Sequence, residues 1–151
     1  MTVTYLSNEF KEGFNAVWNE ITGSDYNNEQ MQLNKEMVSQ LPTVLVQLEG
    51  TNDQKKQCEQ HGDDVDGLAC SIDPNNKGDV ILKIPPSHYL FYYGGNTYSS
   101  ELHFESQYQM GGILGGNAMQ GHDVFFDNEK KLIGFAESKC DYGSAIATDH
   151  K

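Results

Sequence analysis

The stretch that decides the fold is MGGILGGNAMQGHDVFFDNEKKLIGFAESKC, which spans residues 110–140. Two apolar runs in it, VFF at 124–126 and LIGFA at 132–136, flank a polar segment at 128–131. Short apolar runs joined by a few polar residues are typical of a β-hairpin. A glycine-rich segment and a helix-like piece at 117–120 precede the first run. The pattern therefore predicts a hairpin fed by a glycine-rich loop, which is a statement about fold and not about function.

The order of these pieces resembles the C-terminal end of the pepsin-like aspartic endopeptidases, especially their disulfide-bearing members from protists and algae. The resemblance rests on ILG, then VFFD, then IGFA, with a cysteine just beyond. Three other segments agree in the same order: TVTYLSNEF at 2–10, LPTVLVQL at 41–48 and ILKIPPSHYL at 81–90. The resemblance implies a mainly β fold, namely the antiparallel β lobe of a pepsin-like acid protease with two short helices. It also implies hydrolysis of peptide bonds in a peptide or protein substrate.

Catalysis in that family uses two aspartates that share one proton and hold the attacking water between them. Carboxylates this close cannot both ionise cheaply, so their apparent pKa values separate into an acid and a base. The family's second Asp-Ser/Thr-Gly triplet stands just before the segment that is TYL here, at residues 4–6. No such triplet occurs in the 151 residues. We therefore expect both catalytic aspartates and the N-terminal lobe to lie outside this chain, and the chain alone to be inactive.

The resemblance also assigns residues to the walls of the substrate cleft. Thr2 stands four places after the expected aspartate and would bind substrate on the non-prime side. Ile113 would lie near a prime-side pocket, and with Leu114 and Gly115 it would form the loop beside the catalytic turn. The alternative for Ile113 and Leu114 is that they are simply core residues. Asp127 corresponds to a structural aspartate at a strand end, so its spacing from Asp123 does not make a catalytic pair.

An insert at residues 49–78 departs from the family, whose members mostly have a short turn there. We predict a disulfide between Cys58 and Cys70 that pins this surface loop and restricts the unfolded chain. Relatives pair the cysteine corresponding to Cys140 with an earlier one, so a bond from Cys140 to Cys58 or Cys70 is the alternative.

Metal binding by the insert is a weaker interpretation. No CxxC pair is present to suggest zinc. The acidic run that ends at Gly67 departs from a calcium loop at two positions: Gly62 stands where that loop has an acidic residue, and Asp73 stands where it has a glutamate. We expect no metal and no cofactor.

The composition excludes several classes of partner. Twenty-two acidic residues against ten lysines and no arginine give a net charge of -12 at pH 7. Such a surface repels phosphate backbones and anionic lipid headgroups, so nucleic acid and membrane surfaces are not expected partners. No apolar run approaches the ~20 residues that cross a bilayer, and no signal-peptide pattern is visible. The resemblance nevertheless implies the secretory pathway, and leaves open a membrane anchor after Lys151.

Periodicity predicts the remaining elements. A helix should begin after Ser7 or Asn8 and end at Gly23, and a second helix should span 29–40. Strands should cover residues 43–48, 79–84, 89–93 and 102–104. The first helix should bury Phe10, Phe14, Val17, Trp18 and Ile21. Aromatic residues crowd the segment 89–98, and without basic residues among them we expect a packed sheet surface and not a ligand-stacking face.

These expectations give one domain at 1–142 and a disordered acidic tail at 143–151.

The resemblance leaves two functional hypotheses. The chain is part of a working aspartic endopeptidase, or it is a non-catalytic relative that serves as a binding or inhibitory module. An unrelated acidic β-rich domain is a third interpretation, which four motifs in the same order disfavour.

Overall fold

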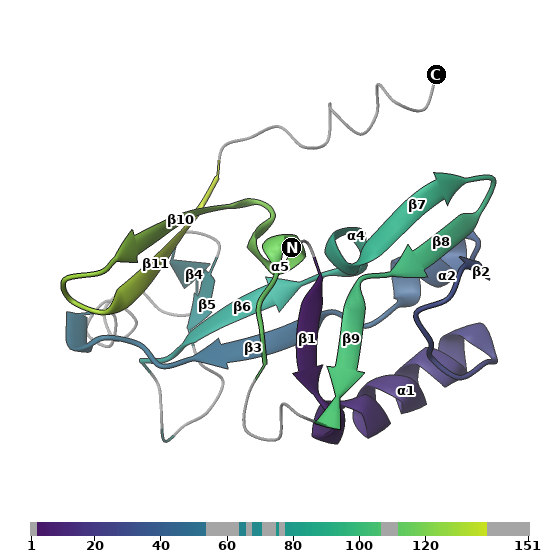
Figure 1. Cartoon of the computed structure of the whole chain (residues 1–151), viewed down its shortest axis with the longest axis horizontal. Helices are drawn as coiled ribbons and strands as arrows, with labels where there is room; N and C mark the ends of the chain where they lie inside the picture. The colour runs from purple at the N-terminus through teal and green to yellow at the C-terminus, as the bar shows by residue number, and fades with distance from the viewer. Residues whose placement is uncertain are drawn as a thin grey trace. The chain divides into compact units, whose positions relative to one another are not determined.

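The computed structural model describes residues 3–53, 64–65, 68–70, 75, 78–106 and 112–138 (Figure 1). Strand is commoner than helix among these residues, and their strands pair mainly antiparallel, with one parallel pair, so the coarse fold expectation is confirmed. The chain forms two compact units, which are described separately: the first from Met1–Val46 and Lys83–Ala118, the second from Gln47–Leu82 and Met119–Lys151. There are more helices than the two expected: α1 (Asn8–Thr22), α2 (Lys35–Gln40), α4 (Pro86–Tyr89) and α5 (Gly116–Met119).

The first unit contains two small sheets. Strand β1 (Thr4–Ser7) pairs in parallel with β9 (Leu102–Glu105). The other sheet has the antiparallel order β2-β8-β7, formed by β2 (Met31–Gln32), β7 (Leu90–Gly94) and β8 (Thr97–Ser100).

Helix α1 follows β1 directly and ends as the sequence predicts. Gly23 adopts φ 74°, a left-handed conformation that suits glycine, and its N–H donates to the Asn19 carbonyl at 2.8 Å. Trp18 is 1% exposed and lies among the rings of Phe14 and Tyr26, with centroids 4.9–6.0 Å apart. This aromatic cluster anchors the helix in the core of the first unit.

The buried stripe of α1 is narrower than predicted. Phe10 and Val17 are 58% and 43% exposed, so the expectation that both are core residues is wrong. At about 100° per residue, both positions lie roughly 80–100° around the helix from Trp18. They therefore stand at one edge of the apolar stripe, while Trp18 occupies the side that packs inward.

The predicted helix at residues 29–40 is wrong in its first half. Met31–Gln32 is strand β2, which pairs with Thr97 and Tyr98 of β8. The helix begins only at Lys35, because the Asn34 side chain caps it by accepting from the Met37 N–H at 2.8 Å. Met31 therefore lies in a strand because it pairs with β8, although its apolar spacing with its neighbours also suits a helix.

The second unit contains most of a four-stranded sheet in the order β3-β6-β5-β4, formed by β3 (Val44–Leu48), β4 (Asp64–Val65), β5 (Leu68–Cys70) and β6 (Val80–Ile84). Asp79, 8% exposed, precedes β6 and accepts hydrogen bonds from the Gln47 amide at 2.7 Å and the Gly50 N–H at 3.2 Å. These bonds tie the end of β3 to the start of β6.

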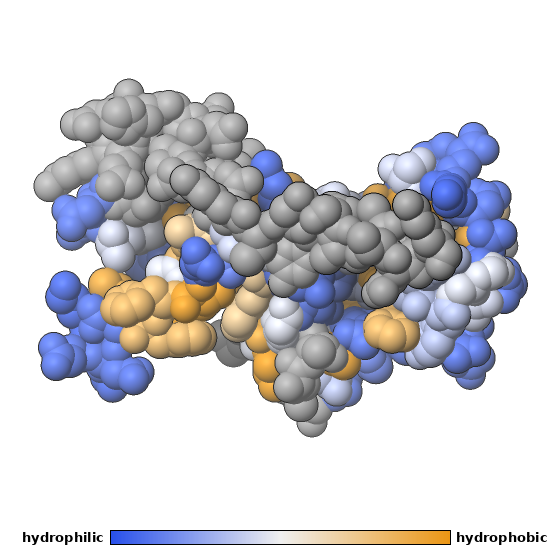
Figure 2. Space-filling model, turned by 90° about the horizontal axis from the view of Figure 1, so that it is seen from above, coloured by the Kyte–Doolittle hydropathy of each residue, from blue (hydrophilic) through white to orange (hydrophobic). Residues whose placement is uncertain are grey.

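The predicted hairpin at the C-terminal end is confirmed. Strand β10 (His122–Asp127) pairs antiparallel with β11 (Leu132–Glu137), with Phe126 opposite Ile133. Phe125, Phe126 and Ile133 are 69%, 56% and 58% exposed. Figure 2 shows hydrophobic side chains gathered at the surface of this hairpin.

Several predictions fall outside the described residues. They are the role of Thr2, the Cys58–Cys70 disulfide, the partner of Cys140, most of the insert 49–78, and the acidic tail 143–151. Cys70 is described only as the last residue of β5. All of these remain predictions.

Candidate functional site

The candidate site surrounds β1, which has a neighbour on each side. Residues of β9 pair with it in parallel, Thr4 lying opposite Leu102. On its other side Ile113 forms an antiparallel bridge with Tyr5, in which each residue donates its N–H to the other's carbonyl at 2.8–2.9 Å. The segment that contains Ile113, Leu114 and Gly115 is therefore hydrogen-bonded alongside the start of the chain's first strand.

A buried polar cluster fixes this arrangement. The Thr4 side chain is 0% exposed, and its hydroxyl donates to the Asn117 amide oxygen at 2.6 Å and accepts from the Gly115 N–H at 3.0 Å. The Asn117 amide nitrogen donates to the Glu101 carbonyl at 3.1 Å, and the Thr4 N–H donates to the same carbonyl at 3.0 Å. The cluster joins β1, the residue before β9, and the loop that enters α5.

Gly112 permits the close approach of the two segments. A Cβ atom at this position would lie 2.3 Å from the Tyr5 carbonyl oxygen and 3.3 Å from the Leu6 Cα. Only glycine lets the backbone come this near. Gly112, Thr4 and Asn117 were not predicted from the sequence as residues of the site. The glycine-rich run MGGILGG carries a signal for the first, because glycine beside a strand often marks a close backbone contact.

The three residues that the resemblance assigns to the loop differ in exposure. Ile113 is 41% exposed, Leu114 is half-buried and Gly115 is buried. The interpretation of Ile113 as a core residue is therefore wrong, and its side chain is accessible to a ligand. Gly115 holds the loop against β1 through the bond from its N–H to the Thr4 hydroxyl.

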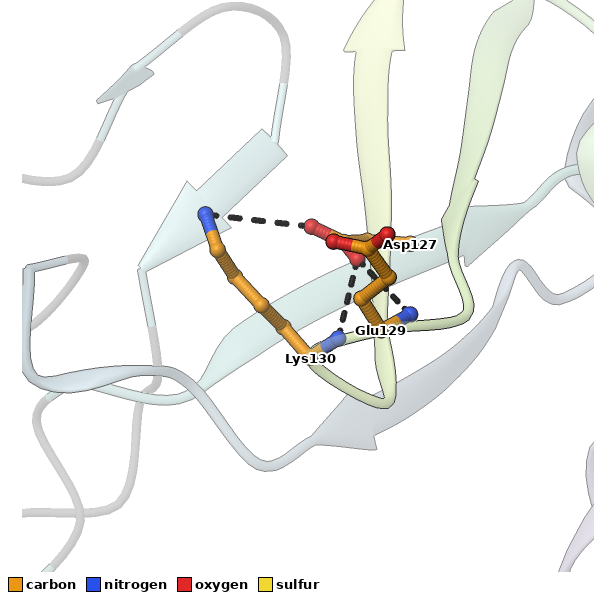
Figure 3. A network of polar contacts seen from close by, with 3 residues as sticks. All are labelled: Asp127, Glu129 and Lys130. Atoms are coloured by element: carbon orange, nitrogen blue, oxygen red, sulfur yellow. Dashed lines mark hydrogen bonds and ion pairs between the residues drawn. The ribbon is translucent and has the colours of Figure 1, made fainter.

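Asp123 and Asp127 do not form a catalytic dyad. They lie four positions apart on β10, a separation of about 13 Å along an extended strand. Asp127 instead holds the hairpin turn, as Figure 3 shows: its carboxylate accepts from the N–H groups of Glu129 at 3.1 Å and Lys130 at 2.9 Å. The Lys130 ammonium lies 3.8 Å from the other carboxylate oxygen, an exposed contact that adds little.

Two buried tyrosines of the first unit each bond a distant segment through the hydroxyl group. The Tyr26 hydroxyl is bonded to the Ser100 hydroxyl at 2.5 Å and donates to the Leu102 carbonyl, while the Tyr89 hydroxyl donates to the Pro42 carbonyl at 2.8 Å. Burial raises the pKa of Tyr26, against smaller opposing effects of Ser100 and Asn28. Burial, and secondarily the charge of Tyr26, raises the pKa of Tyr89.

Neither a metal site nor a membrane-spanning helix is found in the part of the chain that the structure describes. No three His, Cys, Asp or Glu side chains there gather as a metal site would require. No described helix combines the length and apolar character that a bilayer span needs. Comparison with models of known protein families and with curated proteins yields no match.

Proposed function

We propose that this chain is part of the C-terminal lobe of a pepsin-like aspartic endopeptidase of the secretory pathway. Its reaction would be hydrolysis of peptide bonds by a water held between two aspartates, both outside these 151 residues. The chain would contribute a wall of the cleft and the support for one catalytic loop. The missing N-terminal lobe and a peptide or protein substrate would be its partners.

The observation that carries this proposal is the hydrogen-bonded contact between β1 and the segment around Ile113. In the family that the sequence resembles, the catalytic triplet comes just before the TYL strand, and the ILG loop passes beside it. Here Thr4 begins β1 and is bonded to Gly115 and Asn117, 111 and 113 positions further along the chain. Such bonds would hold the exit of a catalytic loop rigid, which is what positioning of a catalytic carboxylate requires.

Ile113 is the residue of this chain that the proposal brings to the substrate. Ile113 is 41% exposed, while its backbone N–H and carbonyl are both hydrogen-bonded to the backbone of Tyr5. A fixed backbone with an accessible apolar side chain suits the lining of a peptide-binding pocket. A substitution of Ile113 in the active enzyme would therefore change the preference for substrate side chains and leave the chemical step intact.

The codons ahead of Met1 in the native transcript test the proposal. We expect them to encode Asp-Ser-Gly or Asp-Thr-Gly running into Thr2, preceded by an earlier lobe with the other aspartate. An in-frame stop or a genuine leader directly before Met1 would contradict the catalytic role. The non-catalytic binding or inhibitory module would then be the working hypothesis.

A further inference from the structure

Asn117 is a buried amide whose oxygen and nitrogen both have hydrogen-bond partners. It lies in α5 and is 3% exposed. Its amide oxygen accepts from the Thr4 hydroxyl at 2.6 Å and from the Ala118 N–H at 3.0 Å. Its amide nitrogen donates to the Glu101 carbonyl at 3.1 Å. The site therefore requires one side chain that is both an acceptor and a donor.

The chemistry of position 117 excludes an anion of the same shape. An ionised aspartate only accepts hydrogen bonds, so one of its oxygens would face the Glu101 carbonyl oxygen with no proton between them. Burial of an unpaired carboxylate is costly as well. A neutral carboxylic acid has one acceptor oxygen and one O–H donor, so it can replace the amide. The position thus tolerates a neutral acid and rejects a carboxylate.

Asn117 fixes the first residue of β1 through two routes. It bonds the Thr4 hydroxyl directly, and it shares the Glu101 carbonyl with the Thr4 N–H, which donates to that carbonyl at 3.0 Å. Thr4 is 0% exposed, so water does not reach the hydroxyl to replace the bond. A change in the Asn117 side chain would therefore shift the start of β1.

We propose that Asn117 is a positioning residue for peptide hydrolysis, an inference that rests on the proposed function. The catalytic aspartate of this lobe would stand just ahead of β1. Asn117 would act on its carboxylate through Thr4 and would not touch the substrate. A displacement of about 1 Å in an active site can lower the rate about 10²-fold. Loss of the Asn117 bonds should therefore lower kcat and leave KM unchanged.

Asn117→Asp makes this role depend on pH in the protein encoded by the full native transcript. At about pH 3, below the usual pKa of an aspartic acid, the new side chain is neutral and should replace the amide. The ratio of the variant's kcat to that of wild type should then be close to one. As pH rises and the new carboxyl ionises, the ratio should fall about 10²-fold.

Other groups near Asn117 do not obscure this profile. The titratable side chains on the adjoining elements are Tyr5, Glu101, His103 and Glu105. They occur in both proteins, so their titration cancels in the kcat ratio.

Urea denaturation of the 151-residue chain tests the hydrogen bonds without any need for activity. Because the folded site favours the neutral acid, the folded variant keeps its proton to a higher pH than the unfolded variant. The stability of Asn117→Asp should therefore match wild type below about pH 4 and decline as pH rises.

Asn27→Asp is the matched control. Asn27 is exposed, and its side-chain oxygen accepts from the Glu29 N–H at 2.9 Å, which a carboxylate can do equally well. This variant should follow wild type in both the kcat profile and the stability profile.

The outcomes separate the positioning role from the proposed function. A kcat ratio that falls with pH at constant KM, in molecules that circular dichroism shows to be folded, supports the role, because a purely structural residue would not change the kcat of folded molecules. An equal loss at every pH, or a ratio near one at every pH, would overturn the role alone. A stability profile like that of Asn27→Asp would overturn the assigned hydrogen bonds. An inactive full-length wild type would overturn the proposed function together with this role, whatever the stability profile.

Discussion

The Thr4 hydroxyl group joins β1 to the loop that enters α5. Because the side chain is 0% exposed, removal of the hydroxyl would leave the Gly115 N–H without a partner in a buried site. A buried donor left unpaired costs about 1–3 kcal/mol. We expect Thr4→Val, which preserves the shape, to lower the free energy of unfolding by that amount in urea denaturation.

Thr4→Ser is the matched control for this substitution. It keeps the hydroxyl and removes one methyl group, at a cost of about 1 kcal/mol. The valine variant should therefore be the less stable of the two. If the valine variant proves as stable as wild type, the polar cluster does not fix the loop beside β1.

Gly112 and Gly13 should respond in opposite directions to the same substitution. Gly112→Ala would place a Cβ 2.3 Å from the Tyr5 carbonyl oxygen, and we expect a loss of about 1–3 kcal/mol as the backbone is forced away. Gly13 lies exposed inside α1 with no atom within 4 Å of an added Cβ. Gly13→Ala should stabilise by about 0.8–1 kcal/mol through helix propensity. Thermal unfolding of both variants measures the difference, and a neutral Gly112→Ala would contradict the close approach.

At the scale of elements, the stability of β9 and its surroundings should depend on alkaline pH. Burial raises the pKa of Tyr26 above its ordinary value of about 10. The folded state therefore retains the Tyr26 proton at a pH where the unfolded chain has already lost it. The stability that Tyr26 contributes is complete below about pH 10 and declines as pH rises through its folded pKa.

Tyr26→Phe isolates this contribution from those of the other tyrosines. At neutral pH the variant should be less stable by about 0.5–1.5 kcal/mol, because the Leu102 carbonyl and the Ser100 hydroxyl each lose one of their partners. Above pH 10 its stability should decline less steeply than that of wild type. Urea titrations at several pH values give both quantities, and parallel pH profiles for the two proteins would refute the assignment.

The β10–β11 hairpin depends on Asp127 for its turn. Asp127→Ala removes the acceptor of two backbone N–H groups, and we expect a loss of about 1 kcal/mol. Asp127→Asn keeps the acceptor oxygen and loses only the exposed contact to Lys130, so it should be nearly neutral. Amide hydrogen exchange of residues 122–137 would measure the effect locally. Equal protection in wild type and the alanine variant would show that other contacts hold the turn.

At the scale of the whole molecule, strongly patterned elements could be predicted from the sequence. The hairpin at 122–137 and the helix that ends at Gly23 carry local signals that tertiary packing does not override. A structural role for Asp127 was implied by the family resemblance, and its hydrogen bonds to the turn agree with that role. The mainly antiparallel β class was implied by the family resemblance and not by these elements alone.

Features that depend on distant contacts could not be predicted. Met31 has helical spacing with its neighbours, but its pairing with Tyr98, 67 positions away, makes it a strand residue. The hydrogen bond between Thr4 and Asn117 connects residues 113 positions apart, and no local pattern signals it. Phe91 and Tyr93 are 51% and 54% exposed, so the expectation of a packed sheet surface is wrong for their segment. Their exposure likewise depends on which element covers the sheet, which composition does not reveal.

Proteolysis at acid pH tests the central claim most directly. The protein encoded by the full native transcript should cleave a denatured protein substrate, and pepstatin should inhibit it, because the claim requires two aspartates that act on a shared water. The 151-residue chain alone should show no turnover under the same conditions. Pepstatin-sensitive turnover by the chain alone, or an inactive full-length protein that contains both Asp-Thr/Ser-Gly triplets, would contradict the account.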